Sequence, residues 1–124
     1  MKRLIIQLWQ TSAEEPQLAA TPFMMAVAGA AMDMDVEIHA LGASVEIFVD
    51  DMASRHRGVA PLARPLSAYV DDALRIGVRV YVCSTAMRDR QLDTAHMIEG
   101  VSEIIGMVSM LERATEPGVT VLTY

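Results

Sequence analysis

The chain carries one cysteine, Cys83, and its thiol is the side chain best suited to covalent chemistry. Cys83 ends an apolar run rich in β-branched residues, and the segment Ser84-Thr85-Ala86-Met87 follows it directly. The free N–H groups at the start of a helix favour a thiolate, and Arg88 and Arg90 would add positive potential nearby. Beside Cys83, the candidate site residues are therefore Ser84, Thr85, Met87 and Arg88.

A purely structural role for Cys83 is the alternative. Free cysteines are among the most buried residue types and often act as small hydrophobic side chains. One cysteine forms no internal disulfide and no cysteine-based metal cage. A thiol peroxidase would need a resolving thiol from another molecule. The position of Cys83 in the sequence leaves these roles open.

A second candidate, His39, lies near the end of a predicted half-buried strand at 36–41, toward the same edge as Cys83. A neutral imidazole there would help to ionise Cys83, whereas a hydrogen-bonded structural histidine is the alternative. The remaining histidines, His56 and His96, do not have the spacing of metal ligands, so we expect no metal site.

The other polar motifs predict solvated surface. Adjacent carboxylates occur at Glu14-Glu15, Asp50-Asp51 and Asp71-Asp72, and neighbouring residues on a helix do not face each other. Thr11-Ser12 follows the first predicted strand but lacks the glycines and lysine of a phosphate-binding loop, so we expect no organic cofactor. The basic segment Arg55 to Arg64 is predicted to be a solvated loop, with docking of an anionic partner as the alternative.

Strand and helix patterns alternate along the chain. Strands are predicted at 4–9, 36–41, 78–83, 101–104 and 119–124. Helices are predicted at 22–34, 43–52 and 66–74, with a helical turn at 86–90 and a helix from 106 through 111. Thr21, Pro22 and Ser44 are interpreted as helix starts and Gly77 as a C-cap. This order predicts a three-layer α/β fold with a mostly parallel sheet, flavodoxin-like in the broad sense.

Length and composition narrow the class of protein. The 124 residues are 52% hydrophobic and 21% charged, which predicts one folded domain. A net charge of -6 argues against general nucleic-acid binding. The longest apolar stretch is too short to span a membrane, and the basic start lacks a signal-peptide core, so we expect a cytoplasmic protein. The helix at 22–34 is apolar nearly all round, which predicts contact with a partner subunit.

Several segments are similar to the DsrE/DsrF-like sulfur-relay family, in family order. The most specific is Gly77-Val78-Arg79-Val80-Tyr81-Val82-Cys83-Ser84-Thr85-Ala86-Met87. The others are Thr21-Pro22-Phe23, Ala31-Met32-Asp33-Met34, Val36-Glu37-Ile38-His39, Ile98-Glu99-Gly100-Val101 and Val121-Leu122-Thr123-Tyr124. The resemblance covers essentially the whole chain and implies a single DsrE-like domain over residues 1–124.

The resemblance implies a three-layer α/β/α fold with a parallel five-stranded sheet, assembled as a homo-trimer or homo-hexamer. It also implies a cysteine that accepts sulfane sulfur as a persulfide, and that role carries over only to Cys83. Some relatives have a second cysteine, which this chain lacks, and others have lost the cysteine and act as scaffolds.

The resulting expectation is a sulfur carrier, of sulfurtransferase type, that takes sulfane sulfur on Cys83. Its partners would be donor and acceptor proteins with reactive thiols, which need a shallow cleft or an exposed rim at the site. The alternative is a non-catalytic interaction or regulatory subunit with the same fold, in which Cys83 only packs. Whether the chain is an enzyme stays open, and the sequence does not identify the donor or the acceptor.

Overall fold

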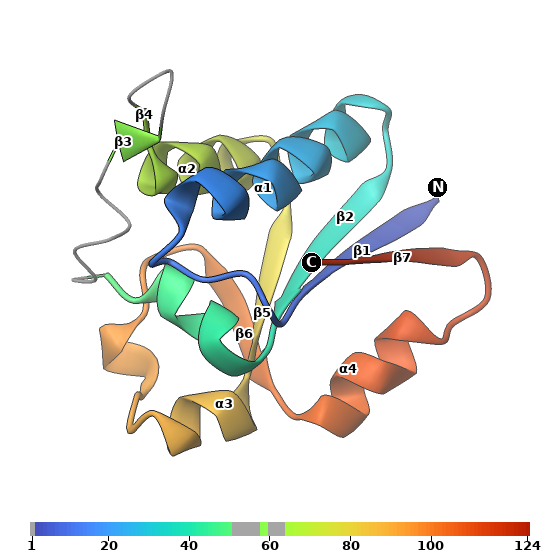
Figure 1. The fold of residues 1–124 in the computed structure, drawn as a ribbon. Helices are drawn as coiled ribbons and strands as arrows, with labels where there is room; N and C mark the ends of the chain where they lie inside the picture. Colours follow the sequence, from blue (N-terminus) through green and yellow to red (C-terminus); the bar gives the residue numbers. More distant parts are fainter. Residues whose placement is uncertain (1, 51–57, 60–63) are drawn as a thin grey trace.

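The computed structural model describes residues 2–50, 58–59 and 64–124 (Figure 1). In chain order the elements are β1 (Arg3–Leu8), α1 (Pro16–Ala31), β2 (Asp35–Ala40), η1 (Gly42–Phe48), β3 (Gly58–Val59), β4 (Arg64–Pro65), α2 (Leu66–Arg75), β5 (Arg79–Cys83), α3 (Ser84–Asp89), η3 (Thr94–His96), β6 (Val101–Ile105), α4 (Met107–Ala114) and β7 (Val119–Thr123). Most of the predicted basic loop, including His56, lies outside the described residues.

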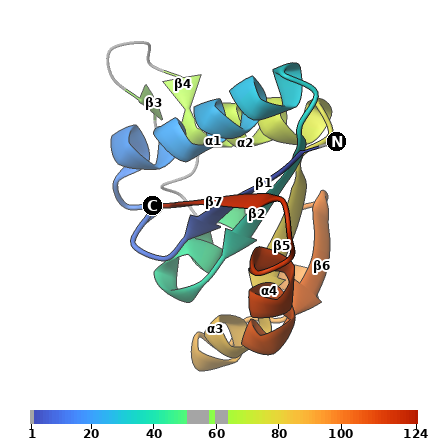
Figure 2. The same cartoon turned by 90° about the vertical axis from the view of Figure 1, so that its right-hand side faces the viewer.

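Five strands form one sheet in the order β6-β5-β2-β1-β7, and each neighbouring pair is parallel. α1 and α2 pack side by side on one face of the sheet, while α4 crosses the other face (Figure 2). This arrangement confirms the predicted three-layer α/β/α fold. β3 and β4 form a separate antiparallel pair next to α2.

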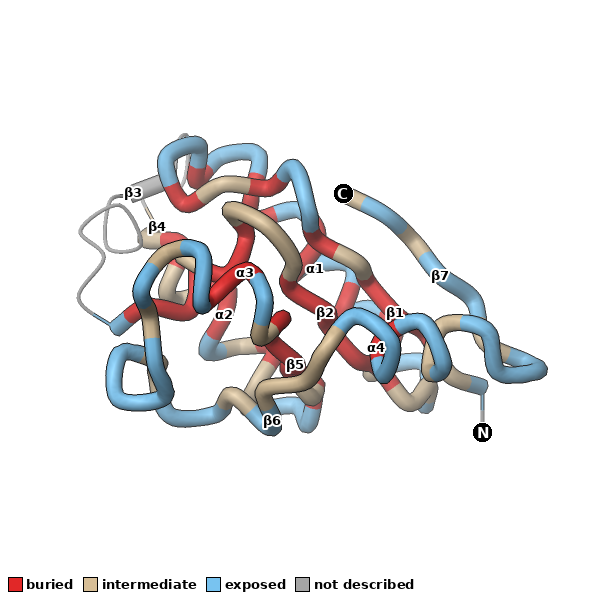
Figure 3. The backbone as a smooth tube through the Cα atoms, turned by 90° about the horizontal axis from the view of Figure 1, so that it is seen from below, coloured by how far each residue is buried: buried red, intermediate tan, exposed pale blue. Residues whose placement is uncertain are grey.

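Side chains of β2 alternate between two buried environments. Val36, Ile38 and Ala40 belong to the hydrophobic core that α1 and α2 share with the sheet. Glu37 and His39 point to the opposite face and are also fully buried, since β2 is a central strand between β1 and β5 (Figure 3). The sequence predicts β2 as half-buried, and this prediction is wrong because both faces of the strand are covered.

α1 begins six residues before the predicted start. Pro16, and not Pro22, occupies the first helical turn, so residues 16–21, which precede the predicted helix at 22–34, are also helical. Pro22 lies inside the helix, where a proline removes one backbone hydrogen bond. Burial of Ala19, Ala20 and Pro22 against the core offsets that loss.

The segment after β2 is the 3-10 helix η1 in place of the predicted α-helix at 43–52. Ser44 does not cap it: the N-cap residue is Leu41, without a side-chain cap. The buried Ser44 hydroxyl instead donates to the carbonyl of Thr11 at 2.6 Å. Val49 then forms an isolated antiparallel bridge with Met97, which ends the helical stretch.

The C-terminal end of α2 confirms the role predicted for Gly77. Its φ of +100° lies in the left-handed region, which glycine adopts without strain. The amide of Gly77 donates to Leu74 and that of Val78 donates to Ala73, which is the Schellman pattern. In the described part of the chain, no helix is long and apolar enough to cross a membrane.

Candidate functional site

Cys83 is the last residue of β5 and the N-cap residue of α3. The predicted helical turn at 86–90 is therefore a longer helix that starts directly at Ser84. Cys83 lies opposite Ile105, the last residue of β6, across the parallel β5–β6 pair. The thiol thus occupies the carboxyl edge of the sheet, where ligands of open parallel sheets gather.

The side chain of Cys83 is fully buried, with 0% of its surface exposed in the single chain. It belongs to the hydrophobic core of the domain. The thiol is therefore not exposed, whereas the sequence led us to expect a shallow cleft or an exposed rim at the site. The single chain, as described, does not present this sulfur to a partner.

The other residues predicted beside Cys83 differ in their placement. Ser84 is half-buried and Met87 is buried, whereas Thr85 and Arg88 are exposed on α3. Arg90 forms an ion pair with Glu46 of η1 at 3.4 Å. Of the features predicted to favour a thiolate, the start of α3 is the one that adjoins Cys83. The charge of Arg90 is instead directed at Glu46.

His39 belongs to a buried polar cluster centred on Glu37. Nε2 of His39 lies 2.9 Å from Oε1 of Glu37, and the carboxylate accepts this hydrogen bond when Nε2 carries the proton. Arg113 of α4 donates from Nε to Oε1 at 2.9 Å and from Nη2 to Oε2. Arg79 donates to Oε2 at 3.1 Å, and Nε of Arg3 lies 3.5 Å from the same oxygen. Four cationic or hydrogen-bonding side chains therefore surround one buried carboxylate.

The cluster determines the ionisation of its members. Burial raises the pKa of Glu37, but the hydrogen bonds from Arg113 and His39 outweigh it and lower the pKa to about 2. Burial lowers the pKa of His39, and Glu37 opposes that shift only in part. The Glu37 carboxylate raises the pKa of Arg113. At neutral pH we therefore expect an ionised Glu37 beside a neutral His39.

The imidazole of His39 packs edge-on against the ring of Tyr81, with the ring centroids 5.4 Å apart. Its Nδ1 is buried without a hydrogen-bond partner among the described residues. This geometry supports the structural interpretation of His39 through Nε2 and leaves the free lone pair of Nδ1 unused.

Sequence reasoning missed the Glu37 cluster. The three arginines come from β1, β5 and α4, so no local spacing relates them to Glu37. One signal was present: a carboxylate and a histidine alternate with apolar residues in the strand predicted at 36–41, within a mostly parallel sheet. Such sheets are covered on both faces, which predicts partners for both polar side chains.

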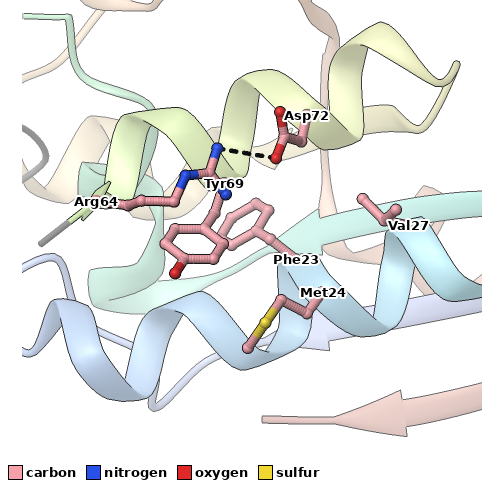
Figure 4. A pocket seen from close by; sticks show the side chains of 6 residues that line it. All are labelled: Phe23, Met24, Val27, Arg64, Tyr69 and Asp72. Atoms are coloured by element: carbon pink, nitrogen blue, oxygen red, sulfur yellow. Dashed lines mark hydrogen bonds and ion pairs between the residues drawn. The ribbon is translucent and has the colours of Figure 1, made fainter. Parts of the chain in front are cut away.

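A hollow of about 260 Å³ lies between α1 and α2, on the face of the sheet opposite the Glu37 cluster (Figure 4). Phe23, Met24 and Val27 form its apolar side. Arg64 stacks over the ring of Tyr69 at 4.6 Å and donates to Asp72 at 3.0 Å. The charge of Arg64 is thereby neutralised, so the hollow is essentially apolar.

Two weaker sequence candidates have structural roles. The carbonyl of Thr11 accepts the Ser44 hydrogen bond, and the hydroxyl of Ser12 accepts one from the amide of Glu14. Nδ1 of His96 accepts a hydrogen bond from the amide of Asp93, which caps η3. Within the described ranges, no group of three His, Cys, Asp or Glu side chains could hold a metal ion.

Comparison with known proteins agrees with the fold. The sequence profile of the DsrE/DsrF-like family matches residues 4–124, so the chain belongs to this family. No protein of curated function matches the chain in sequence at a significant level. Family membership indicates a role related to sulfur relay.

Several solved structures share the fold. The ychN protein from E. coli superposes with a TM-score of 0.80 at 18% identity, covering 100% of both chains. MTH1491 from Methanobacterium thermoautotrophicum, a protein of unknown function, gives 0.72 at 18% identity, also over 100% of both chains. BT1422 from Bacteroides thetaiotaomicron, likewise of unknown function, gives 0.69 at 17% identity over 99% of this chain and 95% of its own. At these identities the likeness shows the fold alone.

Proposed function

We propose that the protein is a sulfur carrier that holds sulfane sulfur as a persulfide on Cys83 and passes it to a partner thiol. The observation that carries the proposal is the position of Cys83 between the end of β5 and the first turn of α3, in a chain of the DsrE/DsrF-like family. Cys83 directly precedes the first residue of that turn, Ser84. The thiolate is the form that attacks a sulfur–sulfur bond.

The transfer needs no metal and no organic cofactor. The Cys83 thiolate attacks the outer sulfur of a donor persulfide, a new S–S bond forms, and the donor leaves as a thiolate. The thiolate of an acceptor then attacks the terminal sulfur on Cys83 and releases the Cys83 thiolate. Each step exchanges one S–S bond for another, so no external oxidant or reductant is consumed. Because the chain has no second thiol, the acceptor belongs to another molecule or subunit.

Intact-mass spectrometry after incubation with glutathione persulfide tests the proposal. We expect an adduct of about 32 Da that dithiothreitol removes, which is the mass of one sulfur atom. Cys83→Ser should lose the adduct, whereas the control variant Ser67→Ala, on α2, keeps the thiol and should retain it. A labelled acceptor thiol should then receive the sulfur from the loaded protein. Uptake of the same adduct by Cys83→Ser would disprove the assignment.

The second candidate function is a non-catalytic interaction subunit, and the complete burial of Cys83 favours it. In that case Cys83 contributes packing, and Cys83→Ala should leave partner binding unchanged. Native protein that never takes up sulfur from any persulfide donor, including a persulfidated donor protein, would support this function over the carrier.

We further propose a homo-trimer or homo-hexamer in the cytoplasm, where the thiol stays reduced. The outer surface of α1 supports self-association because it exposes large apolar side chains. Those side chains are Leu18, Met24, Met25 and Met32.

A further inference from the structure

The burial of Cys83 requires a movement before any other molecule can reach the thiol. Sulfur transfer needs the two sulfur atoms in contact, and 0% of the Cys83 side chain is exposed. Either an element that covers the thiol opens locally, or the whole domain unfolds. The attachment of α4, on the Cys83 side of the sheet, indicates how a local opening occurs.

α4 covers the face of the sheet on which Cys83 lies. Tyr81 and Cys83 share that face because they are two residues apart on one strand. α4 links β6 at one edge of the sheet to β7 at the other, so it must cross this face (Figure 2). The guanidinium of Arg113, near the end of α4, lies 4.7 Å from the centre of the Tyr81 ring.

The beginning of α4 adjoins the end of β5. Gly106, its N-cap residue, follows Ile105, which is the register partner of Cys83. A Cβ atom at position 106 would lie 3.9 Å from the hydroxyl of Ser84. α4 therefore starts beside Cys83 and ends over Tyr81. Met110, between these points, is buried.

α4 is weakly attached by apolar contacts. The structure describes every residue of α4, and among them only Met110 is buried. Met107, Val108 and Leu111 are 53%, 72% and 64% exposed, so its most apolar side points away from the sheet. A hollow of about 290 Å³ lies between α4 and β6, lined by Tyr81 and Ile105 among others. Elements with so little buried surface are those that open locally.

One ionic contact compensates for this weak packing. Arg113 joins α4 to Glu37 of β2 through two hydrogen bonds. The other groups on the Glu37 carboxylate, from Arg3, Arg79 and His39, all belong to strands of the sheet. If α4 moved away, the buried carboxylate would keep these partners. Separating Arg113 from Glu37 therefore costs less free energy than it would if Arg113 were the sole counter-ion.

We propose that α4 is a lid over Cys83, latched by the Arg113–Glu37 pair, and that its opening admits the partner thiol. The meaning of the lid for sulfur transfer rests on the proposed function. The opening itself does not, since any thiol reagent can report it.

The rate at which N-ethylmaleimide alkylates Cys83 in the native protein tests the lid. When reclosing is fast, this rate follows the population of the open form. Arg113→Ala should raise it by about tenfold or more, and Arg113→Lys by less because it keeps a charge near Glu37. Arg64→Ala is the matched control, since Arg64 also stacks on a tyrosine and pairs with a carboxylate but lies on the opposite side of the sheet. We expect no acceleration from it.

Hydrogen exchange of the unmodified protein provides a measurement that does not depend on the stability of a variant. Amides of α4 should exchange faster than those of α1, and alkylation of Cys83 should be faster than global unfolding. Alkylation only at the rate of global unfolding would overturn the lid. So would a folded Arg113→Ala variant that reacts no faster than Arg64→Ala.

The two proposals fail in distinguishable ways. Faster alkylation in Arg113→Ala without any persulfide on the native protein leaves the lid standing and contradicts the sulfur carrier. Persulfide on Cys83 with alkylation insensitive to Arg113 leaves the carrier standing and contradicts the lid.

Discussion

Arg113 and Glu37 are 76 positions apart in the sequence, yet Nε of Arg113 donates to Oε1 of Glu37 at 2.9 Å. This pair connects the last turn of α4 to a central strand of the sheet. Because Glu37 is fully buried, its charge depends on partners from three other elements. The first predictions follow from this dependence.

Glu37→Gln should destabilise the fold strongly. The substitution leaves Arg113 and Arg79 close together without the carboxylate between them. Removing one partner of a buried ion pair costs about 3–5 kcal/mol, and the remaining contact of Arg79 with Asp35 should keep the loss near the lower end. Urea unfolding followed by circular dichroism measures the change. Asp72→Asn, which removes a partly exposed pair with Arg64, is the control and should cost about 0–1 kcal/mol. Equal losses in both variants would contradict the central role of Glu37.

The same carboxylate predicts acid sensitivity. The pKa of Glu37 is lowered to about 2 in the folded protein from an ordinary value of 4.5. Its stabilising contribution is therefore complete above about pH 4.5 and is lost as the pH falls toward 2. A shift of this size corresponds to about 3 kcal/mol. Unfolding free energies measured between pH 5 and pH 2 should decline by about that amount more in the native protein than in Glu37→Gln. Parallel pH profiles for the two proteins would exclude this origin.

The burial of His39 predicts a second, smaller loss of folding stability, at a higher pH than the loss caused by Glu37. Burial lowers its pKa from 6.5, so the unfolded chain binds a proton before the folded one does. The contribution of the neutral imidazole is complete above about pH 6.5 and declines as the pH falls through and below that value. The charged groups around it are Glu37 and Arg113, with Arg79 and Arg3 on the same carboxylate. His39→Gln keeps a donor for Glu37 and cannot titrate, so its stability should change less between pH 7 and pH 5. A variant with the same slope as the native protein would contradict this prediction.

The regular elements could be predicted because local patterns determine them. In α2, apolar residues at helical spacing and Gly77 at the C-terminal end agree with the observed helix and its Schellman pattern. In β5, β-branched residues ending at Cys83 place the thiol at the carboxyl edge of the sheet. Both features depend on residues that are neighbours in the sequence.

The start of α1 and the burial of the site could not be predicted in the same way. Thr21-Pro22 has the composition of a helix start, but packing on the sheet holds Pro22 in the helix interior. The covering of this face of the sheet depends on the chain returning after β6, because Arg113 reaches the ring of Tyr81 only once α4 crosses the sheet. Tertiary contacts of this kind leave no signal in local spacing.

Gly29→Ala should destabilise the protein although alanine is the better helix former. A Cβ atom at position 29 would lie 2.9 Å from Cδ2 of Leu4 and 3.1 Å from Cγ2 of Val36. Both neighbours are buried core residues, so the overpacking penalty of about 1–3 kcal/mol should exceed the helix gain of about 1 kcal/mol. Thermal unfolding measures the sign. Ala28→Gly on the exposed side of α1 measures the propensity alone, and a rise in stability for Gly29→Ala would mean that α1 packs less closely on the sheet.

Met25→Glu should convert the proposed oligomer into monomers. Met24 and Met25 are 50% and 41% exposed on α1, and a carboxylate placed in an apolar interface would be desolvated without a partner. Sedimentation equilibrium at several protein concentrations measures the molecular mass of the variant against that of the native protein. Leu111→Glu is the matched control, since it places the same charge on the exposed apolar side of α4. If α1 forms the interface, Met25→Glu dissociates the assembly while Leu111→Glu keeps it. Dissociation by Leu111→Glu alone would assign the interface to α4, and such an interface would also restrict the opening of the lid.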